Sequence, residues 1–191
     1  MQLKFAMVCA ANNNRSMAAH ELLQQHGMDV KSYGVGTHVR LPGPTAHQPN
    51  VFNFGTPYSD MHRQLQKADE SLYTRNGILP MLARNMKIKQ APERWQDSRQ
   101  RFDIVVTFEE RVQQQLMSDM NSREQESMQP CLVVNIDVTD NHAEAGRAAP
   151  HALRLCQMLE EADDWEDGLD EILTKFEGET GHRPVYDICF Y

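Results

Sequence analysis

Long apolar segments are absent from this sequence. No run of about eighteen apolar residues, the length that a helix needs to cross a bilayer, occurs among the 191 residues. The first residues, Met1–Lys4, lead straight into a predicted strand, without the basic region and apolar core of a secretory signal peptide. We therefore expect an intracellular protein, in the cytosol or the nucleus, without a membrane partner.

Cysteines and clustered histidines are also scarce. The four cysteines, Cys9, Cys131, Cys156 and Cys189, lie far apart and form no C-x-x-C pair, which argues against a zinc site and against a disulfide framework. The eight histidines are scattered without the spacing of metal ligands. We expect no metal and no cofactor, and any cysteine chemistry has to use a single thiol.

Basic residues are too few for a surface that binds nucleic acid. The formal net charge is -8 at pH 7, and the segment Glu160–Glu179 holds ten acidic residues but one lysine. Binding to a phosphate backbone requires a basic face, so we expect no direct nucleic-acid partner. The acidic run is typical of the solvated face of a helix.

The sequence does contain alternating strand-like and helical segments. Four apolar runs predict strands: "LKFAMVC" (3–9), "DVKSYGV" (29–35), "FDIVVTF" (102–108) and "CLVVNIDV" (131–138). Helical patterns cover Met17–His26, Glu109–Met120 and His151–Leu159, and Gly27 suits the left-handed residue that ends the first helix. This alternation predicts an α/β fold, a three-layer sandwich around a mostly parallel central sheet. The ending "RPVYDICFY" predicts a short strand or a packed tail.

The length is that of one domain, so residues 1–191 are expected to fold as a single unit. Residues 37–101, between the second and third predicted strands, are too many for a simple crossover connection. Patterns at Tyr58–Glu70 and Gly77–Asn85 predict two helices in this insertion. We expect the insertion to form a helical cap over the site and to contribute to a substrate groove.

A cysteine stands at the junction of the first strand and the first helix. In open α/β sheets, ligands bind at the carboxyl ends of the strands, where helix N-termini present free N–H groups to anions. The positive potential at such a point stabilises a thiolate. Cys9 is therefore predicted to be a nucleophile.

The residues that follow Cys9 predict a phosphate-binding loop. Five of them can form a nest of backbone N–H groups for phosphoryl oxygens: Ala10, Ala11, Asn12, Asn13 and Asn14. Arg15 adds a planar guanidinium that can hold two oxygens at once, and Ser16 can donate its hydroxyl to the sulfur. C-x5-R is a weak pattern by itself, and a cysteine that ends a buried strand most often serves packing. The flanking strand and helix, with Ser16, favour the catalytic interpretation.

This arrangement resembles the low-molecular-weight tyrosine phosphatase fold, in which an asparagine at the position of Asn12 braces the loop. A more specific resemblance covers Leu3 to Tyr191. Eight motifs in one order are similar to the Ssu seventy-two (Ssu72) family, phosphatases of the RNA polymerase II C-terminal domain. They are "VCAANNNRSMAAH", "SYGVGTHVRLPG", "PNVFNFGTPY", "LYTRNGILPML", "PERWQD", "FDIVVTFEERV", "VVNIDVTDNHAEA" and "CFY".

The resemblance implies a mechanism with a cysteinyl-phosphate intermediate and a general acid. A serine alkoxide is too basic to leave without a proton, so an acid has to reach the loop from another strand end. The family's acid aligns with Asp140, and Asp137, nearer the strand, is expected to be structural. Asp187 is a weaker candidate, because the late acid of tyrosine phosphatases precedes a proline and here none follows. The catalytic set is thus Cys9, Arg15, Ser16 and Asp140.

The resemblance also implies the substrate. The family acts on phosphoserine followed by a cis-proline, at the fifth position of the heptad repeat of the polymerase C-terminal domain. Four residues are implied to line the groove for this bent peptide: Arg40, Pro42, Tyr73 and Met81. At helical spacing, Tyr73 and Met81 are alternatively plain core residues.

The resemblance implies a nuclear protein in transcription and mRNA 3′-end processing, with a cytoplasmic location also open. Its implied partners are the phosphorylated polymerase C-terminal domain and symplekin of the cleavage and polyadenylation machinery. The chain departs from the family pattern at Ala10, Ala11, Ala19, Pro80 and Ala83, which puts the catalytic rate in question more than the reaction.

Two other functions stay open. The first is an arsenate reductase on the same fold, although the other three cysteines lack the close pairing of a thiol relay. The second is a non-catalytic binding module that has diverged from the family. Retention of all four catalytic residues argues against this module, whereas the alanine replacements keep it in consideration.

Overall fold

A five-stranded sheet forms the centre of the computed structural model, which describes residues 2–191. Its strands are β1 (Lys4–Cys9), β2 (Asp29–Gly34), β5 (Ile104–Thr107), β6 (Pro130–Asn135) and β7 (Val185–Phe190). The order is β2-β1-β5-β6-β7; the first four strands are parallel, and β7 pairs with β6 in the antiparallel direction. The closing residues are therefore an edge strand rather than a packed tail.

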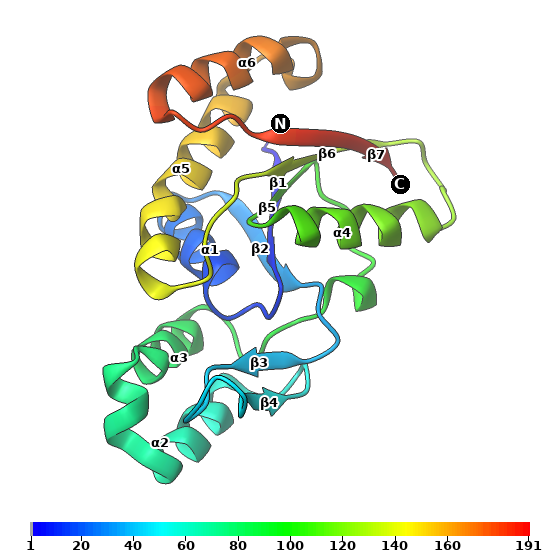
Figure 1. Ribbon diagram of the computed structural model, residues 1–191. Coiled ribbons are helices and arrows are strands. Elements are labelled where there is room, and N and C mark those ends of the chain that lie inside the picture. The colour runs from blue at the N-terminus through cyan, green and yellow to red at the C-terminus, as the bar shows by residue number, and fades with distance from the viewer. Residues whose placement is uncertain (1) are drawn as a thin grey trace.

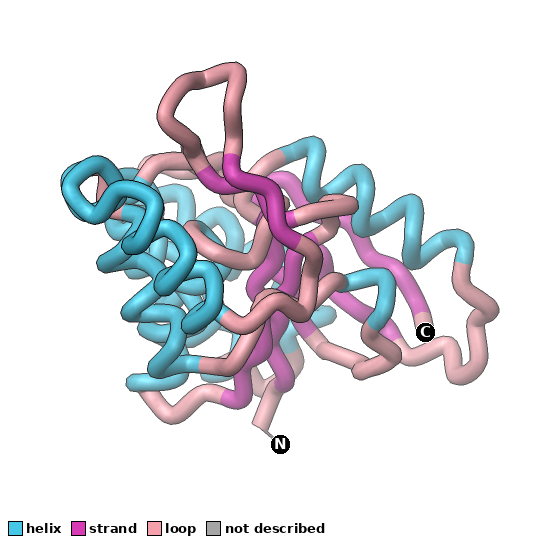
Figure 2. Tube along the Cα trace, turned by 90° about the horizontal axis from the view of Figure 1, so that it is seen from below, coloured by secondary structure: helices cyan, strands magenta, loops and turns pink. Residues whose placement is uncertain are grey.

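Helices cover both faces of the sheet (Figure 1). Helices α1 (Arg15–Gln25), α5 (His142–Glu161) and α6 (Trp165–Thr180) lie on one side, while α4 (Glu110–Ser122) and the short 3₁₀ helix η1 (Trp95–Asp97) lie on the other. Side chains alternate between the faces along a strand, so Phe5 and Met7 enter one core cluster whereas Ala6 and Val8 enter the other. Figure 2 shows the same layers from below. The predicted three-layer α/β fold with a mostly parallel sheet is confirmed.

The observed helix ends show which predicted ends local sequence signals placed correctly. Helix α1 is followed by Gly27 with φ of +75°, as the glycine predicted. The predicted start of α5 at His151 is wrong, because the helix begins at His142 and contains Pro150. The Asn141 side chain accepts a hydrogen bond from the Glu144 N–H and caps the true start. Tertiary packing of the alanine-rich buried face outweighs the proline, which by itself favours a helix start.

Most of the insertion, residues 39–88, forms a separate group of elements beyond the carboxyl ends of β1 and β2 (Figure 1), whereas η1 at its end packs on the sheet. They contain the hairpin β3 (Val39–Leu41) and β4 (Asn50–Phe52), and the helices α2 (Tyr58–Arg75) and α3 (Ile78–Ile88). These elements share a core cluster of their own. Helix α2 is interrupted at Asp69, next to its predicted end, where the Asp69 carboxylate accepts from the Leu72 N–H. The cap function of this insertion and the single domain over residues 1–191 stay predictions.

Within residues 2–191, none of the helices is both long and apolar enough to cross a membrane.

Candidate active site at the first strand–helix junction

Cys9 and Arg15 bracket a buried loop where β1 ends and α1 begins. Cys9 is the last residue of β1, and Arg15 is the first residue of α1. Within the loop, Asn12 is fully buried and has a left-handed φ of 53°. Asparagine tolerates this region better than most residues do. The local sequence therefore bends sharply and brings the helix N-terminus back toward the Cys9 sulfur.

The carbonyl groups at the start of the loop turn toward β2. The Cys9 carbonyl accepts from the Val35 N–H and the Ala10 carbonyl from the Gly36 N–H, each at 3.0 Å. The approach is so close that a Cβ on Gly34 or Gly36 would lie 2.7 or 2.9 Å from the Ala10 oxygen. The glycines in "SYGVG" are therefore required for the backbone of the loop to pack against this segment.

The next carbonyl groups also turn outward. The Tyr58 hydroxyl donates to the Asn12 carbonyl at 2.5 Å, and the Asn13 side-chain amide donates to the Ala11 carbonyl at 2.9 Å. Burial raises the pKa of Tyr58, so its hydroxyl keeps the proton that it donates. Because a trans peptide unit points its C=O and N–H in opposite directions, the N–H groups face the inside of the loop. In the described part of the chain, no N–H of residues 10–14 donates to a protein group.

Ser16 lies within hydrogen-bond distance of the cysteine sulfur. Its Oγ lies 3.0 Å from the Cys9 Sγ and accepts a hydrogen bond from the Asn12 Nδ2 at 3.1 Å. A hydroxyl has one proton, and the amide nitrogen of Asn12 is only a donor, so the serine proton is available to the sulfur. Asn12 is itself held, because its Oδ1 accepts from the Glu93 N–H. This arrangement stabilises negative charge on the Cys9 sulfur.

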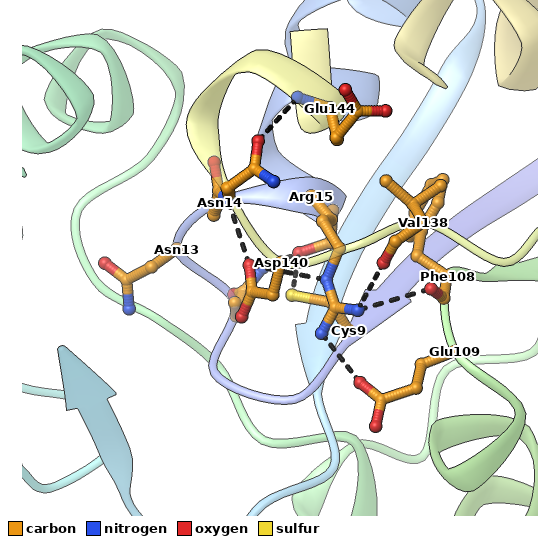
Figure 3. A network of polar contacts seen from close by, with 12 residues as sticks. Cys9, Asn13, Asn14, Arg15, Phe108, Glu109, Val138, Asp140 and Glu144 are labelled. Atoms are coloured by element: carbon orange, nitrogen blue, oxygen red, sulfur yellow. Dashed lines mark hydrogen bonds and ion pairs between the residues drawn. The ribbon is translucent and has the colours of Figure 1, made fainter. Parts of the chain in front are cut away.

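Arg15 is buried but does not extend over the loop opening (Figure 3). Its Nη1 donates to the Val138 carbonyl at 2.9 Å and the Phe108 carbonyl at 3.3 Å, and its Nη2 pairs with the Glu109 carboxylate at 3.0 Å. Its Nε lies 3.5 Å from the Asp140 carboxylate. The predicted bidentate clamp on a phosphoryl group requires a turn of this guanidinium and stays a prediction.

Asp140 reaches the loop from the segment between the end of β6 and the start of α5 (Figure 3). Its Oδ1 accepts a hydrogen bond from the Asn14 side chain at 2.9 Å. The Asp140 side chain is 56% exposed, so a proton exchanges readily with solvent. Of the three aspartates that the sequence offered, Asp140 alone lines a cavity with Cys9.

The two alternative aspartates lie elsewhere. Asp137 accepts from the Glu110 N–H and the Asn135 side chain, and so joins β6 to the start of α4. Asp187 of β7 accepts from the Gln113 side chain of α4. Both carboxylates thus support packing between the sheet and α4.

A cavity of about 220 Å³ connects Cys9 to the insertion. Of the predicted groove residues, Arg40, Pro42 and Met81 line this cavity, and so do Ala11, Asn13 and Asn14 of the loop. Tyr73 does not line it. Its side chain is 2% exposed in the core of the insertion. Its hydroxyl accepts from the Asn50 amide, which also donates to the Pro42 carbonyl. Tyr73 therefore supports the groove from behind.

Comparison with known proteins identifies the family. A family model for Ssu72-like proteins matches residues 3–191. The RNA polymerase II C-terminal domain phosphatase SSU72 of Danio rerio is 51% identical over 190 residues, which cover 99% of this chain and 97% of the relative. The chain belongs to the Ssu72 family.

Solved Ssu72 structures have the same fold as this chain. A Drosophila melanogaster serine phosphatase of the RNA polymerase II C-terminal domain is 41% identical, with a TM-score of 0.97 and full coverage of both chains. D. melanogaster Ssu72 with symplekin, bound to a cis peptidomimetic of that domain phosphorylated on its fifth-position serine, is 39% identical with a TM-score of 0.96. That alignment covers 100% of this chain and 99% of the Drosophila chain.

Sequence reasoning missed several residues of this Ssu72-family site. Glu109 holds Arg15, Tyr58 holds the loop, and His142 lines the cavity beside Asp140. Arg84 donates to two carbonyl groups of the loop. Only Glu109 carried a local signal, an acid directly after a strand; the others come from segments whose approach depends on the tertiary fold.

Proposed function

We propose that this chain is a cysteine-dependent phosphoserine phosphatase of the RNA polymerase II C-terminal domain. The observation that carries the proposal is the Cys9 sulfur, which lies 3.0 Å from the Ser16 Oγ in a loop whose N–H groups donate to no backbone carbonyl of the described residues. Phosphatase activity on the same domain is named for the full-length relative from D. rerio.

The reaction takes two steps. In the first, the Cys9 thiolate attacks phosphorus, an S–P bond forms, and the P–O bond to the substrate serine breaks. Asp140 gives its proton to the departing serine oxygen. In the second step, the Asp140 carboxylate takes a proton from water, which attacks phosphorus and breaks the S–P bond. Inorganic phosphate leaves, and Ser16 stabilises the departing thiolate.

The loop and Arg15 stabilise the charge that develops in both steps. The inward N–H groups of residues 10–14 are already oriented toward the equatorial oxygens of a phosphoryl group. Arg15 contributes when its guanidinium turns from Glu109 toward these oxygens. Since the backbone supplies the binding groups, Ala10 and Ala11 are compatible with this role.

The proposed substrate is a phosphoserine at the fifth heptad position, followed by a cis-proline. The Drosophila relative was solved with a cis peptidomimetic of this kind. In this chain, Pro42 and Met81 supply apolar surface beside the loop, and Arg40 supplies positive charge for an additional phosphate or carboxylate of the peptide. From the same similarity to Ssu72 proteins we propose three further properties: a nuclear location, a role in mRNA 3′-end processing and binding to symplekin.

Comparison of the wild type with Cys9→Ser tests this function. Purified wild type should hydrolyse heptad peptides with phosphoserine before proline, with the fifth position preferred, and should act more slowly on phosphotyrosine. Cys9→Ser should abolish turnover because the thiolate is gone, while phosphopeptide binding persists through the loop. Phosphate release and peptide binding by calorimetry are the measurements. An inactive but folded wild type, or an active Cys9→Ser, would overturn the proposal.

A further inference from the structure

Helix α3 presents a second arginine to the back of the loop. The Arg84 Nη2 donates to the Asn13 carbonyl at 2.9 Å and to the Asn14 carbonyl at 3.3 Å. The Asn85 side-chain amide donates to the same Asn13 carbonyl at 2.8 Å. The Asn85 Oδ1 accepts from the Arg84 Nε and Nη2 at 3.1 and 2.9 Å. The guanidinium is therefore fixed in position by a fully buried asparagine.

These contacts set the direction of one peptide unit. The Asn14 carbonyl also accepts from the Ala18 N–H at 2.9 Å, so helix α1 fixes it without Arg84. The Asn13 carbonyl, by contrast, accepts only from Arg84 and Asn85 among the described residues. In a planar trans peptide, the N–H points away from the C=O, so the Asn14 N–H points away from Arg84, toward the inside of the loop. Arg84 thus acts on the reacting groups through the backbone and not by direct contact.

The charge of Arg84 is not neutralised by a contact. Within residues 2–191, no carboxylate lies within ion-pair distance of its guanidinium. Burial lowers the pKa of Arg84, whereas the charges of Glu21, Tyr58 and Cys9 raise it. The cation at Arg84 therefore favours a bound phosphoryl group, which is an anion.

The same helix contributes to the substrate cavity. Ile78 and Met81 line it; Met81 lies three residues before Arg84 and four before Asn85, and Ile78 lies seven residues before Asn85. Residues at such spacing share one side of a helix. One side of α3 therefore carries both the groove contacts and the contacts that orient the loop.

We propose that Arg84 is a positioning residue, which holds the Asn13 carbonyl and so orients the Asn14 N–H toward the phosphoryl site, and whose charge favours a bound phosphoryl anion. It links the groove helix to the loop. This inference rests on the proposed function, because it takes residues 10–14 to be the phosphate-binding loop.

The test compares Arg84→Gln and Arg84→Lys with the wild type. The glutamine variant should lower kcat/KM by about 10²–10³-fold, as loss of an oriented donor does at other anion sites. Lysine keeps the charge and one donor, so it should recover part of this loss. Inorganic phosphate should protect Cys9 from alkylation by iodoacetamide less well in Arg84→Gln than in the wild type, and Arg84→Lys should lie between the two. Inhibition by inorganic phosphate should weaken in the same order.

Two further samples separate positioning from folding. Arg84→Ala should regain activity when guanidinium ion is added at concentrations that do not unfold it, because the ion can occupy the vacated site. Arg63→Gln, an exposed arginine on α2, should match the wild type in every measurement. Thermal melting of all variants reports whether the fold persists.

Distinct results would overturn the inference. If the wild type is active and Arg84→Gln stays within twofold in kcat/KM and in the protection of Cys9 by phosphate, Arg84 has no positioning role. If activity falls while this protection and phosphate inhibition are unchanged and guanidinium does not rescue Arg84→Ala, the role is structural only. An inactive wild type would instead contradict the proposed function.

Discussion

At the scale of single residues, the site is a set of matched hydrogen-bond donors and acceptors. Asn12 donates from its amide to Ser16, which leaves the serine proton for the Cys9 sulfur. Asp140 is held at the cavity by Asn14 and the more distant Arg15. In each case a neighbouring side chain occupies one hydrogen-bonding position of the residue. The donor or acceptor that remains is then available to the reacting groups.

The proposed role of Asp140 as general acid can be tested with two substrates whose leaving groups differ in basicity. Asp140→Asn should lower turnover by about 10²–10⁴-fold on a phosphoserine peptide, the usual range for general acid catalysis. The loss should be much smaller on an aryl phosphate with an acidic phenol, which departs without a proton. Steady-state rates on both substrates measure this difference. Asp187→Asn, whose carboxylate contacts α4, is the matched control and should change neither rate. Equal losses on both substrates would make Asp140 a scaffold residue.

At the scale of elements, the loop is held by segments from three places in the chain. The residues just after β2 donate to the first carbonyl groups, α2 contributes Tyr58, and α3 contributes Arg84. The residues that approach most closely are glycines at 34 and 36. The loop is thus rigid because its outer surface is fully engaged.

A substitution at Gly36 tests this packing. In Gly36→Ala the new Cβ would lie 2.9 Å from the Ala10 oxygen, a backbone atom that cannot move without shifting the loop. We expect kcat/KM to fall by about 10–100-fold, since small misplacements of reacting groups are costly. Gly178→Ala in α6 is the control, because no atom lies within 4 Å of its Cβ. That variant should keep full activity and gain about 0.5–1 kcal/mol of stability. A fully active Gly36→Ala would show that the loop is less constrained.

At the scale of the whole molecule, the packing of α1 against the sheet encloses a buried histidine. His20 of α1 is 5% exposed and shares a hydrogen bond with Ser32 of β2 at 2.8 Å. Burial lowers its pKa from 6.5 to about 4, and the charges of Lys89 and Lys31 add to the effect. His20 is therefore neutral in the folded protein at neutral pH.

This histidine predicts an acid-sensitive fold. Between about pH 6.5 and pH 4 the unfolded chain binds a proton at His20 that the folded chain does not, so stability falls as the pH falls through this window. The loss should approach about 2–3 kcal/mol at pH 4. Urea unfolding against pH should show a shallower slope for His20→Gln than for the wild type. His26→Gln, at the exposed end of the same helix, should retain the wild-type slope. Equal slopes for wild type and His20→Gln would exclude this origin.

Much of the fold follows from local signals. The apolar runs predicted the four parallel strands, and Gly27 predicted the end of α1. The predicted start of α5 at His151 was wrong, because Pro150 is a local signal for a helix start that tertiary packing overrides. The predicted end of α2 at Glu70 lies next to the break at Asp69, although the helix resumes and ends at Arg75.

The sequence by itself determined which residues meet at the first junction, because Cys9, Ser16 and the loop between them are neighbours in the chain. The tertiary structure decided which aspartate reaches Cys9, where Arg15 points, and which side chains hold the outer face of the loop. These contacts join residues that are far apart in sequence, such as Arg84 and Asn13. Their distances depend on how α3, β6 and the loop pack in three dimensions, which no local pattern encodes.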